Sequence, residues 1–106
     1  MDEKFWNHVN NCVDWLNEKN GCDREEVTNR ILKLTEEVGE VAQARIGMLG
    51  QNPRKGVTHT VGDVGDELCD VMLTAAVAIA SIVDFNAEMV MEDYIERRSA
   101  RLEKLR

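Results

Sequence analysis

The sequence predicts an all-α domain of four helices packed as a bundle. Hydrophobic residues make up 43% of the chain, charged residues 31% and aromatic residues 5%, with a single proline, which favours a compact helical protein over a disordered or all-β one. Apolar residues also recur at helical spacing. The 106 residues suffice for one domain, residues 1–106, and we expect so small a domain to cover a wide apolar face by forming a homo-oligomer.

The first half of the chain predicts two helices. Over residues 3–19 an apolar stripe at helical spacing stops at Asn20-Gly21, with Trp6 and Trp15 at its margins. Asp23 followed by Glu26 has the form of a capping box and starts a second helix that runs to about residue 49. The side chains expected to face inward are Phe5, Val9, Cys12, Val13 and Leu16 in the first helix, and Val27, Ile31, Leu34, Val38, Val41 and Ala42 in the second.

The second half predicts a loop and two more helices. Residues 50–60, GQNPRKGVTHT, contain the only proline and two glycines around Arg54-Lys55, which is typical of a loop. Thr60 with Asp63 is a cap signal for a third helix over about residues 61–83, whose later part is apolar on nearly every side. After a turn at 84–86, a fourth helix is expected over about residues 87–105.

Composition excludes several classes of function. The net charge of −7 disfavours binding to nucleic acid through general electrostatics. The start MDEKFW lacks a secretory pattern, and the apolar run 71–83 is too short to span a membrane. Three cysteines without CxxC spacing favour reduced thiols over a disulfide framework or a zinc site. We therefore expect a cytoplasmic protein with no membrane partner.

Carboxylates border the apolar stripes of two helices. Glu36, Glu37 and Glu40 make an acidic edge on the second helix, and Asp63, Glu67 and Asp70 make another on the third. Antiparallel packing across the 50–60 loop would bring both edges together, where partly buried carboxylates repel one another unless a cation neutralises them. With oxygen ligands, and with no His or Cys expected near either edge, Mg²⁺ or Mn²⁺ fits better than zinc.

Two other interpretations of these acids stay open at this stage. They can be solvated charges on helix faces, for example with Lys33 and Glu37 as an i,i+4 pair. A di-iron carboxylate bundle is disfavoured because its Glu-x-x-His motif would need a histidine where Asp70 stands.

The pattern Glu36-Glu37-x-x-Glu40, 26 residues, then Glu67-x-x-Asp70 resembles the EExxE…ExxD signature of the MazG-like all-α nucleoside triphosphate pyrophosphohydrolases. RILKLTEEVGEVAQA and DVGDELCDVMLTAAVAIA resemble the two motif helices of that family, and QNPRKGVTHT resembles the connecting loop of its small actinobacterial-type members. The resemblance covers about residues 30–81, roughly half of the chain.

This resemblance implies a Mg²⁺-dependent enzyme, with Mn²⁺ as a possible substitute, that converts a nucleoside triphosphate or its deoxy form to the monophosphate and pyrophosphate. By position in the motif, the implied metal ligands are Glu37, Glu40, Glu67 and Asp70, and Glu36 would help to hold a further metal or the attacking water. The implied catalytic residues are Glu36, Glu37 and Glu40. A dimer or dimer of dimers formed through the third helix is expected. The alternative from another class is a non-catalytic helical interaction protein that keeps the acidic cluster for structure or cation-linked assembly.

Substrate contacts outside the acids are expected from basic and aromatic residues. Arg54 and Lys55, a basic pair in a glycine-flanked loop, are candidates for the distal phosphates. The family often has Lys and Asn on the last helix, where this chain has DYIERRSARL, so Arg97, Arg98 or Arg101 could contact phosphate or simply form a solvated basic tail. Trp15, with Trp6 and His8, could line a base pocket or pack in the core, and His59 is expected to make a local hydrogen bond.

Overall fold

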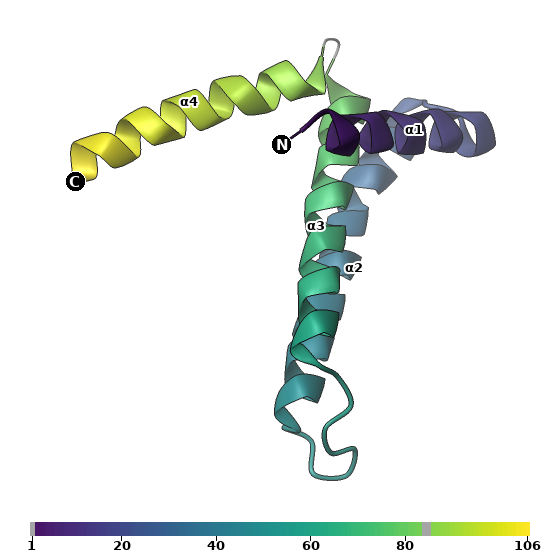
Figure 1. Cartoon of the computed structure of the whole chain (residues 1–106). Helices are drawn as coiled ribbons and strands as arrows, with labels where there is room; N and C mark the ends of the chain where they lie inside the picture. Colours follow the sequence, from purple (N-terminus) through teal and green to yellow (C-terminus); the bar gives the residue numbers. More distant parts are fainter. Residues whose placement is uncertain (1, 84–85) are drawn as a thin grey trace.

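The computed structural model describes residues 2–83 and 86–106, and all regular structure among them is helical. The helices in chain order are α1 (Glu3–Asn20), α2 (Arg24–Leu49), α3 (Val61–Ile82) and α4 (Ala87–Leu105) (Figure 1). The all-α class and the four predicted helices are thus confirmed, with ends within about one residue of those expected. Residues 84 and 85 of the predicted turn lie outside the described residues.

Local capping explains where α2 and α3 begin and end. The Asp23 side chain accepts a hydrogen bond from the Glu26 amide at 2.9 Å, which satisfies one free N–H of the first turn of α2. Gly50 ends α2 in the left-handed conformation, which glycine adopts without steric cost. At the start of α3, Thr60 and Asp63 form a complete capping box.

A hairpin of α2 and α3 is the centre of the molecule, and its two helices lie antiparallel and side by side (Figure 1). On α2 the buried residues are Arg30, Glu37 and Ala44. Their spacing of seven residues is close to two helical turns, so they share the face that meets α3.

The inward face predicted for α2 is wrong in part, because Ile31, Val38 and Ala42 are exposed in the single chain. Apolar residues on α2 form two neighbouring stripes, and helical periodicity alone does not say which of them meets α3. The stripe that does so carries Arg30 and Glu37. The contact therefore buries two charged side chains, which hydropathy would have placed in solvent.

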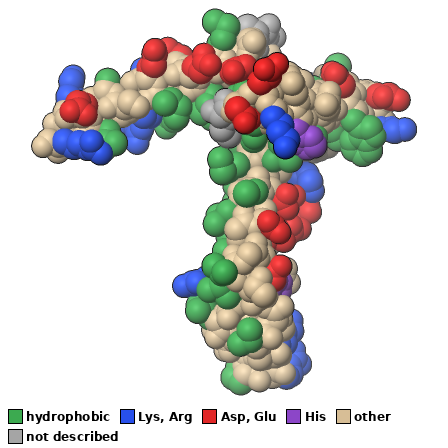
Figure 2. All heavy atoms as spheres, in the orientation of Figure 1, with side chains coloured by type: hydrophobic (Ala, Val, Ile, Leu, Met, Phe, Trp, Pro, Cys, Tyr) green, Lys and Arg blue, Asp and Glu red, His purple; other side chains and the backbone are tan. Residues whose placement is uncertain are grey.

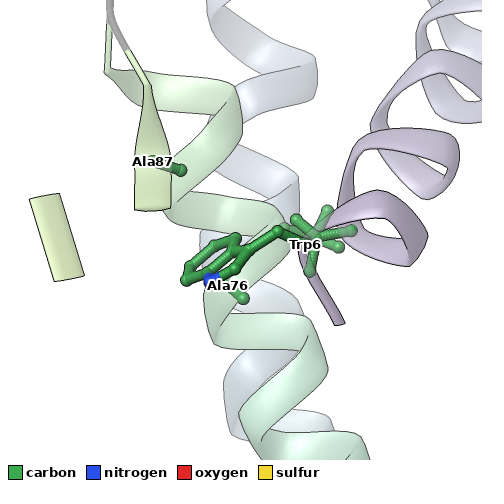
Figure 3. Packing of buried hydrophobic residues seen from close by; sticks show 5 residues of the cluster. Trp6, Ala76 and Ala87 are labelled. Atoms are coloured by element: carbon green, nitrogen blue, oxygen red, sulfur yellow. The ribbon is translucent and has the colours of Figure 1, made fainter. Parts of the chain in front are cut away.

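The apolar core lies where α1 crosses the later part of α3 (Figure 1). Trp6, which is 4% exposed, extends from α1 over Ala76 of α3, with Ala87 at the start of α4 close by (Figure 3). Val9 is fully buried in the same cluster. Trp6 was predicted to lie at the margin of the apolar stripe of α1, and this prediction is wrong. The later part of α3 and the start of α4 both pack against its ring. Trp15, by contrast, is 59% exposed.

A buried arginine joins α1 to the hairpin. Arg30 is 5% exposed, and its guanidinium lies 2.7 Å from the Glu26 carboxylate. It also donates to Asn17 Oδ1 at 3.0 Å, Ser81 Oγ at 3.1 Å and the Gly21 carbonyl at 2.8 Å. Because these partners come from the end of α1, the turn after it and the end of α3, one side chain fixes how these three segments meet.

The helix α4 extends away from the hairpin, so the four helices of one chain do not lie side by side as a closed bundle (Figure 1). Several of its apolar side chains are exposed, namely Met89, Tyr94, Ile95, Leu102 and Leu105. Within residues 2–83 and 86–106, no single helix is long and apolar enough to cross a membrane. Only α3 and α4 taken together have the required length and hydropathy, and these two helices are bent by 113° relative to each other.

Candidate metal centre

Three carboxylates from the two hairpin helices converge at mid-height of the hairpin. One oxygen each of Glu37 on α2 and of Glu67 and Asp70 on α3 lie within 4.8 Å of one another. Antiparallel packing produces this group because Glu67 and Asp70 are three residues apart on one face of α3, opposite Glu37. The predicted convergence of the two acidic edges is therefore found for these three residues.

Two of these carboxylates have a buried oxygen without a partner. Glu37 is 8% exposed, and Glu37 Oε2 and Glu67 Oε2 have no hydrogen-bond donor among the residues described. A buried acceptor left unpaired costs about 1–3 kcal/mol, and more when it carries charge. Two oxygens of the group are thus without a hydrogen-bond donor among the described residues, and a divalent cation would satisfy both.

The electrostatics of the group resist ionisation of Glu37. Desolvation by burial raises the pKa of the Glu37 carboxyl above its usual value, and the charges of Glu40, Asp70 and Glu36 raise it further. Only Lys33, whose Nζ lies 3.7 Å from Glu37 Oε1, acts in the opposite direction. A bound cation would reverse this balance, because it favours the ionised form.

The other predicted acids occupy less central positions. Glu40 is half-buried and close enough for its charge to raise the pKa of Glu37, but it is not one of the three converging carboxylates. Glu36 is exposed and lies 3.2 Å from Lys33 Nζ. Asp63 caps α3, where its Oδ2 accepts the Thr60 amide at 2.8 Å. Its role in the described structure is therefore to start the helix.

Three carboxylates as ligands suit a hard cation such as Mg²⁺ or Mn²⁺. The expectation that no His or Cys lies near either acidic edge is wrong. His8 and Cys69 both line a pocket of about 350 Å³ that includes Asp70. Cys69 is the sequence neighbour of Asp70 and could have been noticed. His8 could not, because its position depends on how α1 crosses α3.

A second pocket with apolar walls lies between α1 and the hairpin. Its volume is about 220 Å³, and the residues lining it are Cys12, Trp15, Leu16, Arg30, Lys33, Leu73, Thr74 and Val77. Lys33 contacts the carboxylates as well, at Glu36 and Glu37, so this pocket adjoins the carboxylate group. Trp15 is the exposed aromatic side chain of its wall, whereas Trp6 belongs to the core.

The basic candidates lie away from the three carboxylates in the single chain. Lys55 lines a pocket at the loop end of the hairpin together with Gly47, which is ten residues, or about 15 Å of helix, beyond Glu37. Arg54 is exposed in the same loop.

The arginines of α4 are also distant from the cluster, because α4 extends away from the hairpin (Figure 1). Arg97 pairs with Asp93 at 3.1 Å, and the guanidinium groups of Arg97 and Arg98 lie over the Tyr94 ring. Arg101 is exposed. Contacts of any of these basic residues with phosphate stay predictions.

Comparison of the chain with protein-family models, with curated proteins and with solved structures finds no match.

Proposed function

We propose that the chain is a Mg²⁺-dependent nucleoside triphosphate pyrophosphohydrolase of the MazG-like type, which converts (d)NTP to (d)NMP and pyrophosphate. The observation that carries this proposal is the pair of buried, unpartnered oxygens, Glu37 Oε2 and Glu67 Oε2, in a group of three converging carboxylates. Solvated charges on a helix face would not be buried without partners. This arrangement favours a cation site, and the acidic motif at these positions favours that particular reaction.

In this proposal Glu37, Glu67 and Asp70 would hold the ion, and Glu40 adds negative charge beside them. A bound divalent cation would neutralise charge on the triphosphate and would stabilise the charge that develops during an in-line displacement. A water oxygen forms a bond to the α-phosphorus while the bond to the bridging oxygen breaks and pyrophosphate leaves. The proton of the water passes to a carboxylate at the edge of the cluster, Glu40 or Glu36.

The nucleobase would occupy the apolar pocket beside the cluster. Trp15 offers an exposed ring for stacking, and Leu16 and Leu73 provide apolar surface. Lys33 lies between this pocket and the carboxylates, so its ammonium group would face the triphosphate.

A second copy of the chain would cover the apolar surface that one copy leaves open, as a dimer or tetramer. Exposed large apolar side chains follow both hairpin helices, and they are Ile31, Leu32, Val38, Ile46 and Leu49 on α2 and Val61, Leu68, Met72 and Ile82 on α3. Monomeric proteins rarely expose so long a row of apolar residues.

The same surface also favours the second candidate, a helical interaction protein without catalysis. The two candidates differ in what the carboxylates do. In the interaction protein, neutralising them would leave the binding of a partner unchanged and no nucleotide would be consumed.

The experiment that separates the candidates is pyrophosphate release from a panel of ribo- and deoxynucleoside triphosphates, with Mg²⁺ and with EDTA. We expect turnover with Mg²⁺ and no turnover in EDTA. We also expect Glu67→Gln to abolish the turnover. The control is Glu96→Gln, which makes the same chemical change at an exposed position on α4 and should keep full activity. Failure of every triphosphate with both Mg²⁺ and Mn²⁺ would overturn the proposal.

A further inference from the structure

Positive charge is concentrated at the loop end of the hairpin. Between Val41 and Gly62 the chain has three basic residues, Arg45, Arg54 and Lys55, and no Asp or Glu, although its net charge is −7. In Figure 2 the Lys and Arg side chains gather at this end of the hairpin, and acidic side chains lie farther up. The ion pairs found within residues 2–83 and 86–106 involve none of these three cations.

A pocket of about 310 Å³ lies at this end, which is near the lower limit for small-molecule sites. Six of the nine residues that line it have polar or basic side chains, while apolar atoms form most of the wall surface itself. The lining residues are Gln43, Ile46, Gly47, Gln51, Asn52, Lys55, Gly56, Thr58 and His59. Lys55 supplies a full positive charge, and the side-chain amides of Gln43, Gln51 and Asn52 supply hydrogen-bond donors. This combination suits an anion.

The pocket is built by close packing of the loop on α2. The Thr58 amide donates to the Gly47 carbonyl at 2.9 Å, and a side chain at position 47 would collide with Thr58 and His59. The Thr58 hydroxyl bonds His59 Nδ1 at 2.8 Å, which leaves Nε2 for another partner. Asp63, the next carboxylate along the chain, is engaged by Thr60 and does not line the pocket.

We propose that the pocket at the loop end of the hairpin, with Lys55 and His59 in its wall, is a binding site for a phosphoryl group and is separate from the carboxylate group. The nearest residue of its wall, Gln43, lies six residues or about 9 Å of helix beyond Glu37, and Lys55 and His59 lie farther away in the loop, so a ligand held by these two side chains does not depend on a cation at the carboxylates. The site does not rest on the proposed hydrolase activity. Its ligand is inorganic phosphate, pyrophosphate or the phosphate of a nucleotide.

The test is an NMR titration of ¹⁵N-labelled protein in EDTA with inorganic phosphate, pyrophosphate and AMP, at constant ionic strength. We expect the amides of residues 43–59 to shift and those around Glu37 to stay. Lys55→Gln should weaken binding about tenfold, because a charge-assisted hydrogen bond is lost. Arg54→Gln removes the same charge from the neighbouring position outside the pocket and should weaken binding far less.

The ranking of the three ligands identifies the source of the phosphoryl group, and tight binding of any one supports the site. Glu67→Gln should bind equally well, so loss of hydrolase activity and loss of this site are distinguishable. The proposal is overturned if none of the three shifts the amides of residues 43–59, if sodium chloride shifts them equally, or if Arg54→Gln and Lys55→Gln weaken binding alike.

Discussion

Neutralising Glu37 should stabilise the metal-free protein and remove its response to Mg²⁺. In Glu37→Gln the buried charge disappears, and the new amide can donate a hydrogen bond to Glu67 Oε2, which has no partner. Satisfying one buried acceptor contributes about 1 kcal/mol, which corresponds to a rise in Tm of about 4–8 °C for a domain of this size. Greater stability together with lost Mg²⁺ binding is the behaviour expected of a functional cluster.

The gain should also depend on pH. Since burial and neighbouring carboxylates raise the pKa of Glu37, wild type loses stability as the pH rises from about 4.5 through that raised value. The difference between Glu37→Gln and wild type should therefore be small at pH 4 and reach its full size above the raised pKa.

Urea and thermal unfolding in EDTA and in Mg²⁺, at one protein concentration, measure both effects. Glu96→Gln is the matched control, because that glutamate is exposed on α4 and should change neither stability nor the response to Mg²⁺ by more than about 0.5 kcal/mol. The reasoning is refuted if Glu37→Gln and the control unfold alike in EDTA and both keep the stabilisation by Mg²⁺.

Three further predictions concern the fold and the proposed base pocket. Arg30→Met should cost about 3 kcal/mol in urea unfolding, because it leaves the part-buried Glu26 carboxylate without its ion-pair partner and removes hydrogen bonds to Asn17, Gly21 and Ser81. A loss below about 1 kcal/mol would contradict the role given to this arginine. Trp6→Ala should lower the free energy of unfolding by about 3–5 kcal/mol, because Trp6 is buried in the core. Trp15→Ala should change it by less than about 1 kcal/mol and should raise KM for the nucleotide. Equal effects of the two variants on stability would show that core and pocket are wrongly assigned. Hydrogen bonds from the backbone and side chain of Thr60 hold the pKa of Asp63 below its usual value, so Asp63 stabilises α3 above about pH 3.8 and this contribution is lost as the pH falls through the lowered pKa. Asp63→Asn should therefore be less stable than wild type at pH 6 and equal to it in strong acid, as followed by circular dichroism.

Periodicity and caps were sufficient to predict the helices. The Asp23 and Thr60 caps and the Gly50 stop are local signals, and the structure uses all three. Glu37, Glu67 and Asp70 could be predicted to converge because helical spacing and an antiparallel hairpin determine their positions to within a turn.

Features that depend on contacts between helices could not be predicted in this way. Which face of α2 is buried, the one with Ile31 or the one with Arg30, depends on how α3 packs against it. The burial of Arg30 also requires hydrogen-bond partners from three segments. Trp6 and Trp15 differ in burial only because α3 and α4 cover one side of α1. His8 comes near Asp70 through the same crossing of α1 over α3.

The most direct test of the proposed reaction is hydrolysis of nucleoside triphosphates in H₂¹⁸O with Mg²⁺, with the products analysed by mass spectrometry. Attack of water at the α-phosphorus predicts one ¹⁸O in the nucleoside monophosphate and none in pyrophosphate. Label in pyrophosphate, or formation of a nucleoside diphosphate with labelled phosphate, would contradict the proposed displacement, and the absence of any product would contradict the proposed enzyme.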